Sequence, residues 1–187
     1  MSSPKNYARK TLSFFLDLIF PLLCLACSLY LKTEKERGRR LCKECSEKIV
    51  LYDALFCPAC SRRLPVIKNS FPARPPCHKS SPFILAAAAS YENPVVRGLI
   101  HTLKYGLIMP AFSVLEELVL RPYLKKSGIL DAITGECLII PVPLHPKKER
   151  ARGFNQSLLI AKTFRDSLEI PIPLASRTLI KIKNTPP

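Results

Sequence analysis

Residues 24–60 read CLACSLYLKTEKERGRRLCKECSEKIVLYDALFCPAC and carry three Cys-x-x-Cys pairs. These pairs are Cys24/Cys27, Cys42/Cys45 and Cys57/Cys60. The spacing lets two thiolates from one tight turn reach the same metal ion, and two such turns complete a tetrahedral site. The first two pairs are separated by 14 residues, which is close to the spacing of structural zinc ribbons. We therefore predict that Cys24, Cys27, Cys42 and Cys45 bind one structural Zn²⁺.

The third pair has a less complete partner further along the chain. Cys77 is followed by His78, and Ser80 stands where a second cysteine of that pair would be. We predict Cys57, Cys60 and Cys77 as ligands of a second zinc site, with His78 as a candidate fourth ligand. An interleaved pairing of the cysteines is an open alternative, as are free thiols or local disulfides. Crowded Cys-x-x-Cys pairs favour zinc in a reducing compartment, so a cytoplasmic location is expected.

An apolar run at residues 12–31 is long enough to suggest a membrane segment or a signal peptide. Asp17 lies inside the run, and an acidic residue in a membrane helix costs about 3 kcal/mol. Pro21 would break the helix near its middle. We therefore predict an amphipathic helix within residues 1–22 and no stable membrane span, with a membrane-anchored protein as the less favoured alternative.

The composition favours a folded protein with an anionic partner. The chain has 187 residues, 48% of them hydrophobic, which excludes a fully disordered protein. The 29 basic and 14 acidic residues give a net charge of +15. Nucleic acid, a phosphorylated small molecule and anionic lipid all fit this charge. The mixed charges at residues 32–40 are interpreted as a solvated loop, because Glu34 and Glu36 interrupt the basic residues.

The second half of the chain, residues 81–187, carries an α/β pattern. Residues 83–91, 138–142 and 174–182 are expected to form strands. Helices are expected over residues 94–105, after the Asn93 cap, and over residues 154–168. A third helix is expected over residues 111–125, with Pro122 ending it early. The proline-rich residues 71–82 are expected to be a linker that follows a ribbon module at residues 23–80.

A basic segment joins the 138–142 strand to the following helix. Residues 144–153 read LHPKKERARG and precede Phe154. Loops at the carboxyl ends of strands are common ligand sites in α/β sheets, and helix N-termini favour phosphate. The segment therefore predicts a site for phosphate or pyrophosphate groups, although a solvated basic loop is the simpler alternative. The candidate ligand-binding residues are Lys147, Lys148, Arg150, Arg152, Gly153, Asn155 and Gln156.

Several segments together resemble the ComF family of competence-associated proteins. Residues 91–106, YENPVVRGLIHTLKYG, resemble its segment ending in Leu-Lys-Tyr near a glycine. Residues 140–156, IPVPLHPKKERARGFNQ, resemble its Pro-Val-Pro-x-His and Arg-Gly-Phe-Asn-Gln signature. Residues 177–187 resemble its basic stretch leading into Thr and Pro. The cysteine pairs resemble its zinc ribbon.

The resemblance implies a partial type I phosphoribosyltransferase-like fold preceded by a small zinc-ribbon module. It also implies phosphoribosyl pyrophosphate with Mg²⁺ as ligand, and a role in DNA uptake with single-stranded DNA or competence proteins as partners. In that family an acidic pair followed by a Thr-Thr-Gly-type turn holds the ribose phosphate, whereas the acidic pair here, Glu116-Glu117, lies within an expected helix and lacks the Gly/Thr turn. We therefore expect a C-terminally truncated member that does not catalyse phosphoribosyl transfer. The alternative is a non-catalytic zinc-ribbon adaptor that binds nucleic acid or a competence partner.

Overall fold

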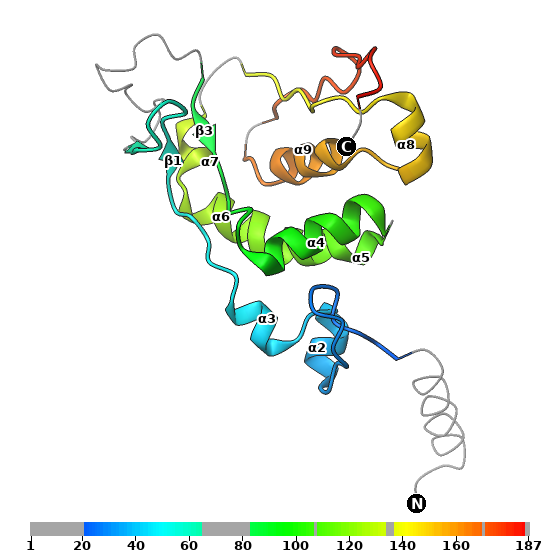
Figure 1. Cartoon of the computed structure of the whole chain (residues 1–187). Helices are drawn as coiled ribbons and strands as arrows, with labels where there is room; N and C mark the ends of the chain where they lie inside the picture. The colour runs from blue at the N-terminus through cyan, green and yellow to red at the C-terminus, as the bar shows by residue number, and fades with distance from the viewer. Residues whose placement is uncertain (1–20, 65–82, 107, 134–136, 170, 186–187) are drawn as a thin grey trace, which may run out of the picture.

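The computed structural model describes residues 21–64, 83–106, 108–133, 137–169 and 171–185. Residues 21–49 of the ribbon, blue and cyan in Figure 1, lie against one side of the helices α4 (Pro94–Tyr105) and α5 (Met109–Leu115). Helices α8 (Pro146–Arg152) and α9 (Gln156–Asp166) lie on another side of them. The predicted N-terminal helix within residues 1–22 and the linker at residues 71–82 fall almost entirely outside the described residues.

The ribbon begins with a tight turn that holds the first cysteine pair. A single antiparallel bridge between Leu23 and Tyr30 closes this turn. Helix α2 (Glu34–Arg39) follows, and Thr33 and Glu36 form a reciprocal capping box at its start. Helix α3 (Lys43–Glu47) then follows, with Cys42 of the second pair as its N-cap residue and Cys45 inside it. The sequence predicted a solvated loop at residues 32–40, and the structure has a short exposed helix there.

The third cysteine pair lies in a hairpin of a small antiparallel sheet. Strands β1 (Leu55–Phe56), β2 (Arg63–Leu64) and β3 (Leu85–Ala86) pair in the order β2-β1-β3. The pairing of β1 with β3 continues outward through a bridge between Leu51 and Ala89. The expected strand at residues 83–91 is therefore present but short, and it pairs with the ribbon.

Helix α4 forms as its sequence predicts. The side chain of Asn93 accepts hydrogen bonds from the backbone N–H groups of Val95 and Val96, and Pro94 occupies the first turn. The buried side chains are Val95, Val96, Leu99 and Leu103. The helix ends at Gly106, where a Cβ atom would lie 2.8 Å from the carbonyl oxygen of Thr102.

The next helical stretch does not end at Pro122 as expected. Helix α5 continues through a π-helical turn, η2 (Glu116–Leu120), into α6 (Arg121–Lys126). The backbone N–H of Arg121 reaches the carbonyl of Glu116 across this wider turn. Pro122 comes just after this wider turn, and the turn accommodates its ring and its missing N–H within the continuous helical stretch. Helix α7 (Ile129–Ala132) follows.

The C-terminal part contains less strand than the sequence predicted. Residues 137–143 and 171–175 lie side by side in parallel but share only one bridge, between Ile139 and Leu174. The basic segment, expected as a loop, forms helix α8, which the imidazole Nδ1 of His145 caps at 3.2 Å from the Lys147 nitrogen. Helix α9 forms within the predicted range. These elements are compatible with an α/β arrangement but do not establish a phosphoribosyltransferase-like fold.

The ribbon and helix α4 share one hydrophobic core. Its buried members are Cys24, Leu31, Leu41, Cys42, Cys45, Val95, Leu99 and Val114. The hydroxyl of Thr102 donates to the carbonyl of Leu25 at 3.2 Å, and the amide of Asn93 donates to the carbonyl of Lys48. At Gly98, a Cβ would lie 3.4 Å from the carbonyl oxygen of Ala26. The ribbon therefore packs directly on one face of α4.

Candidate metal centre and anion cleft

Four cysteine sulfurs from the first two pairs meet at one place. The sulfurs of Cys24, Cys27, Cys42 and Cys45 all lie within 4.8 Å of one another. Those of Cys27 and Cys42 are 3.8 Å apart. A tetrahedral zinc site with Zn–S bonds of about 2.3 Å has sulfur–sulfur edges of about 3.8 Å. The structure brings the four cysteines of the predicted first site together, and their arrangement fits structural Zn²⁺.

The two halves of this site are built differently. Cys24 and Cys27 lie on a tight turn in which the N–H of Ser28 donates to the Cys24 carbonyl at 2.8 Å. Cys42 instead is the N-cap residue of α3, and Cys45 lies in its first turn. The N–H of Ser46 donates to the Cys42 carbonyl at 3.0 Å, so the second pair keeps the bond that closes the first turn but continues into a helix. Burial raises the pKa of Cys42, although the backbone N–H of Cys45 at the start of α3 acts to lower it.

The pKa values of the cysteine thiols at this centre shift in different directions. Burial raises the pKa of Cys24, but hydrogen bonds from the backbone of Cys42, Cys27 and Ala26 outweigh it and lower that pKa to about 7. Burial raises the pKa of Cys42 to about 11, and burial with the neighbouring sulfurs also raises that of Cys45. Several buried thiolates are unfavourable together without a cation, and a bound dication removes that cost.

The third cysteine pair repeats the turn of the first. The N–H of Ser61 donates to the Cys57 carbonyl at 2.8 Å, and the N–H of Cys57 donates to the Arg62 carbonyl at 2.9 Å. At the first pair, the N–H of Ser28 likewise donates to the Cys24 carbonyl, and the N–H of Cys24 donates to the Leu29 carbonyl. Ser28 and Ser61 both have positive φ, 60° and 56°. Cys57 and Cys60 therefore have the geometry of a zinc-binding turn, while Cys77 lies outside the described residues.

The carboxylate of Glu36 joins the start of α2 to the start of α3. It accepts hydrogen bonds from the backbone N–H groups of Lys43, Thr33 and Lys32, at 2.9, 2.9 and 3.1 Å. These bonds, that of Lys43 foremost, lower the pKa of Glu36 from 4.5 to about 2. The network fixes the backbone directly beside the metal ligand Cys42.

Because the pKa of Glu36 is lower in the folded protein, its stabilising effect should be complete above pH 4.5 and lost as the pH falls toward 2. We expect Glu36→Gln to lower the thermal midpoint at pH 7, since an amide oxygen accepts more weakly than a carboxylate. The difference in thermal midpoint between this variant and the unaltered protein should stay constant down to about pH 4.5 and become smaller below it. Thermal unfolding across that range, with zinc in excess, measures this. A difference that grew on acidification would contradict the role given to Glu36.

A second candidate site is a cleft of about 660 Å³ on another face of α4. Helix α4 contributes Val96, Ile100, Leu103 and Lys104, and α5 with η2 contributes further apolar side chains. The opposite wall comes from residues 142–144, from α8 and from the start of α9. The cations that line the cleft are Lys104, Lys148, Arg152 and Lys181.

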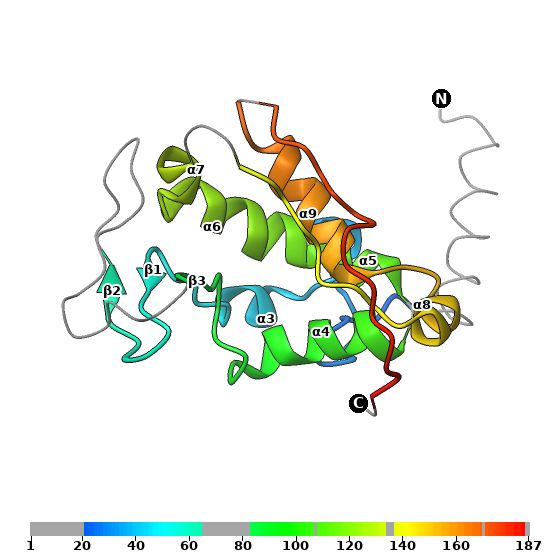
Figure 2. The ribbon, with the colours of Figure 1, turned by 90° about the horizontal axis from the view of Figure 1, so that it is seen from above.

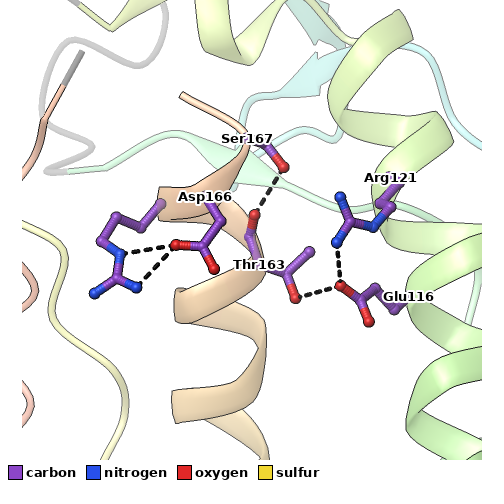
Figure 3. A network of polar contacts seen from close by, with 6 residues as sticks. Glu116, Arg121, Thr163, Asp166 and Ser167 are labelled. Carbon is purple, nitrogen blue, oxygen red and sulfur yellow. Dashed lines mark hydrogen bonds and ion pairs between the residues drawn. The ribbon is translucent and has the colours of Figure 1, made fainter. Parts of the chain in front are cut away.

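The acidic side chain in the cleft lining already has partners. Glu116 accepts a hydrogen bond from Thr163 at 2.9 Å and pairs with Arg121 at 2.7 Å, as Figure 3 shows. Its charge is therefore largely compensated within the protein. The four cations of the cleft consequently leave it with an excess of positive charge.

The predicted phosphate-binding residues divide into two groups. Lys148 and Arg152 lie one turn apart on α8 and line the cleft, together with Asn155 and Gln156 at the start of α9. Lys147 and Arg150 are exposed and do not line it, and Gly153 ends α8 with a φ of 77°. The sequence reasoning missed Lys104 and Lys181 as cleft residues. Both lie in segments that carry the ComF resemblance, at residues 91–106 and 177–187.

The side chains of Arg152 and Asn155 are held in place by contacts within this cleft. The guanidinium of Arg152 lies 5.5 Å from the ring centre of Tyr105 and donates to the Gln156 oxygen at 3.2 Å. The other end of that amide, Gln156 Nε2, is buried and has no hydrogen-bond partner within the described residues. Asn155 caps α9 through Ser157 and donates to the Val142 carbonyl at 3.2 Å. An unpaired donor beside a fixed guanidinium suits an anionic oxygen.

Comparison with known proteins identifies the N-terminal region. Residues 15–81 match the family model described as a double zinc ribbon domain. The match covers all three Cys-x-x-Cys pairs and Cys77, and it agrees with the sulfur cluster at the first two pairs. No curated protein and no solved structure matches the chain. Within the part of the chain that the structure describes, no helix is long and apolar enough to cross a bilayer.

Proposed function

We propose that this protein is a ComF-like protein in which a zinc ribbon supports a site for phosphorylated ligands. The observation that carries the proposal is the cleft in which Lys148, Arg152 and the unpaired Gln156 Nε2 meet at the start of α9. Helix α9 has 11 residues, so its N-terminus adds favourable positive potential. Phosphoribosyl pyrophosphate with Mg²⁺ is the ligand that the ComF resemblance suggests.

The ribbon is a weaker candidate for anion binding than the cleft. Several of its cations already interact within the protein: Arg39 with Glu117, Lys43 with Glu47, and Arg37 with the Tyr30 ring. These contacts are exposed and individually weak, yet they offset part of the positive charge. This distribution favours a phosphate-binding cleft over a ribbon that binds nucleic acid as an adaptor. A role in DNA uptake would then involve the cleft.

Arg152→Ala should weaken pyrophosphate binding by about tenfold or more, because a hydrogen bond to a charged group contributes about 1.5–3 kcal/mol. Lys148→Ala should also weaken pyrophosphate binding. Lys147→Ala is the matched control, because Lys147 is a neighbouring cation outside the cleft lining. Calorimetric titration with pyrophosphate, with and without Mg²⁺ and at two salt concentrations, measures the effect. Equal affinity in the Arg152 and Lys147 variants would reject the cleft as the site.

We further propose that this chain binds without transferring the phosphoribosyl group. Its sequence has no acidic pair followed by a Gly/Thr turn to hold the ribose and its 5-phosphate. Incubation with phosphoribosyl pyrophosphate and Mg²⁺ should therefore release no pyrophosphate above the protein-free rate. Measurable turnover would show that other residues supply these contacts.

A further inference from the structure

The four sulfurs of the first zinc centre differ in their access to solvent. Cys24, Cys42 and Cys45 are buried, at 2%, 4% and 6% exposure, and they belong to the core that the ribbon shares with α4. Cys27, the fourth member of the cluster, is exposed. The reactivity of a zinc-bound or free cysteine follows its thiolate character and its accessibility. A small reagent dissolved in water therefore reaches this centre first at Cys27.

The exposed position of Cys27 follows from the tight turn that carries it. The turn closes at Cys24, which accepts from the Ser28 N–H and donates to the Leu29 carbonyl, both at 2.8 Å. These bonds hold Cys24 on the inner side, whereas Cys27, Ser28 and Leu29 are all exposed. The backbone of the same turn therefore buries one sulfur of the pair and leaves the other at the surface.

The sulfur of Cys42 lies close to that of Cys27. The two sulfurs are 3.8 Å apart, so a disulfide between them needs an approach of about 2 Å. The alternative partner within the turn, Cys24, is less available, because its sulfur accepts hydrogen bonds from the backbone of Cys42, Cys27 and Ala26. Cys42 is therefore the favoured partner of an oxidised Cys27.

We propose that Cys27 is the residue at which hydrogen peroxide oxidises this centre, and that Cys42 then forms a disulfide with it. The Cys27 thiolate attacks one oxygen of the peroxide, the O–O bond breaks, hydroxide leaves and Cys27 becomes a sulfenic acid. The Cys42 thiolate attacks the Cys27 sulfur and displaces a second hydroxide. The peroxide takes up two electrons, one from each sulfur. The centre loses two of its four ligands and releases Zn²⁺ with its charge unchanged.

The oxidation couples the surface of the ribbon to α4. Cys42 belongs to one core cluster with Leu99, so release of the metal should accelerate hydrogen exchange in α4. The disulfide keeps the first turn attached to the start of α3, and a dithiol reductant with zinc should restore the centre. The inference does not depend on the phosphate site, because neither Cys27 nor Cys42 lines the cleft.

Peptide mapping of the full zinc-loaded chain after limited hydrogen peroxide treatment identifies the bond. Trypsin cleaves after lysine and arginine, which leaves Cys24 and Cys27 together on residues 11–32, Cys42 on residues 41–43 and Cys45 on residues 44–48. After acid quenching and alkylation of the remaining thiols, the first product should join residues 11–32 to residues 41–43. A first disulfide within residues 11–32, or one to residues 44–48, would overturn the proposal.

Variants of the protein provide an independent check. Cys27→His keeps four ligands, since three cysteines and one histidine also hold structural zinc, but it removes the exposed thiolate. Cys45→His is the matched control, because it has the same ligand set and retains Cys27. Loss of the free Cys42 thiol to peroxide should be about tenfold or more slower in Cys27→His and unchanged in Cys45→His. Equal rates in the two variants contradict the proposal. Metal analysis shows whether both hold zinc, and if Cys27→His does not, the peptide map decides alone.

Discussion

Cys42→Ser is expected to release zinc from the first site and to unfold the ribbon. Cys42 supplies one sulfur of the four-cysteine cluster and also begins helix α3. Binding of structural zinc contributes about 10–16 kcal/mol of folding free energy in small zinc-dependent modules. Cys42 and Leu99 belong to one core cluster, so the loss should spread to α4. Metal analysis should show one equivalent less of zinc, and hydrogen exchange should accelerate throughout α4.

Cys137→Ser is the matched control, because Cys137 is a partly buried cysteine outside the cluster. We expect its zinc content and its exchange in α4 to equal those of the unaltered chain. A Cys42 variant that kept its zinc, or that lost zinc while α4 stayed protected, would contradict the coupling of metal and helix.

Leu99→Ala should be the most damaging single truncation on α4. Leu99 is completely buried and belongs to the core shared with Cys24, Leu31 and Leu41. Removing a buried leucine side chain costs about 2–5 kcal/mol, through lost burial and the cavity left behind. The cavity would adjoin the zinc-binding turn, so we also expect faster zinc transfer to a chelator. Thermal unfolding and the rate of transfer to a chromogenic chelator measure the two effects.

Ile100→Ala provides the comparison on the next residue of the same helix. Ile100 is only half-buried and lines the cleft rather than the ribbon contact. Its truncation should cost less stability and leave the chelation rate unchanged. Equal chelation rates in the two variants would show that the Leu99 core does not support the metal site.

The zinc cluster and α4 could be predicted because their signals are local. The ligand spacing around Cys24 and Cys42 restricts which thiols can meet on one metal ion. Asn93, Pro94 and the following apolar residues specify both the start of α4 and its buried face. The family match at residues 15–81 then supports the ribbon independently of any geometry.

Other features depend on contacts between distant residues and could not be predicted. The close approach of Gly98 to Ala26 and the bond from Thr102 to Leu25 join segments about 70 residues apart in the chain. The π turn at Glu116 relieves the conflict at Pro122, and no periodicity argument includes such a turn. The prolines and the high charge of the 144–153 segment favoured a loop, whereas His145 and Pro146 start a helix.

The division of the basic residues on α8 follows from that helix. In a loop, Lys147, Lys148, Arg150 and Arg152 would be equivalent candidates for phosphate. On a helix, Lys148 and Arg152 share one face, and only this pair lines the cleft. The sequence identified a segment that borders the cleft, and the helical period separates the cations that line the cleft from the exposed ones.

We expect one Zn²⁺ to be bound by Cys24, Cys27, Cys42 and Cys45 in the ribbon that supports α4. Zinc K-edge X-ray absorption on the Cys57→Ser/Cys60→Ser variant tests this, because the variant removes the third pair from the signal. The spectrum should show one zinc per chain surrounded by four sulfurs at about 2.3 Å. A first shell containing nitrogen or oxygen, or a variant that retains no zinc, would contradict it.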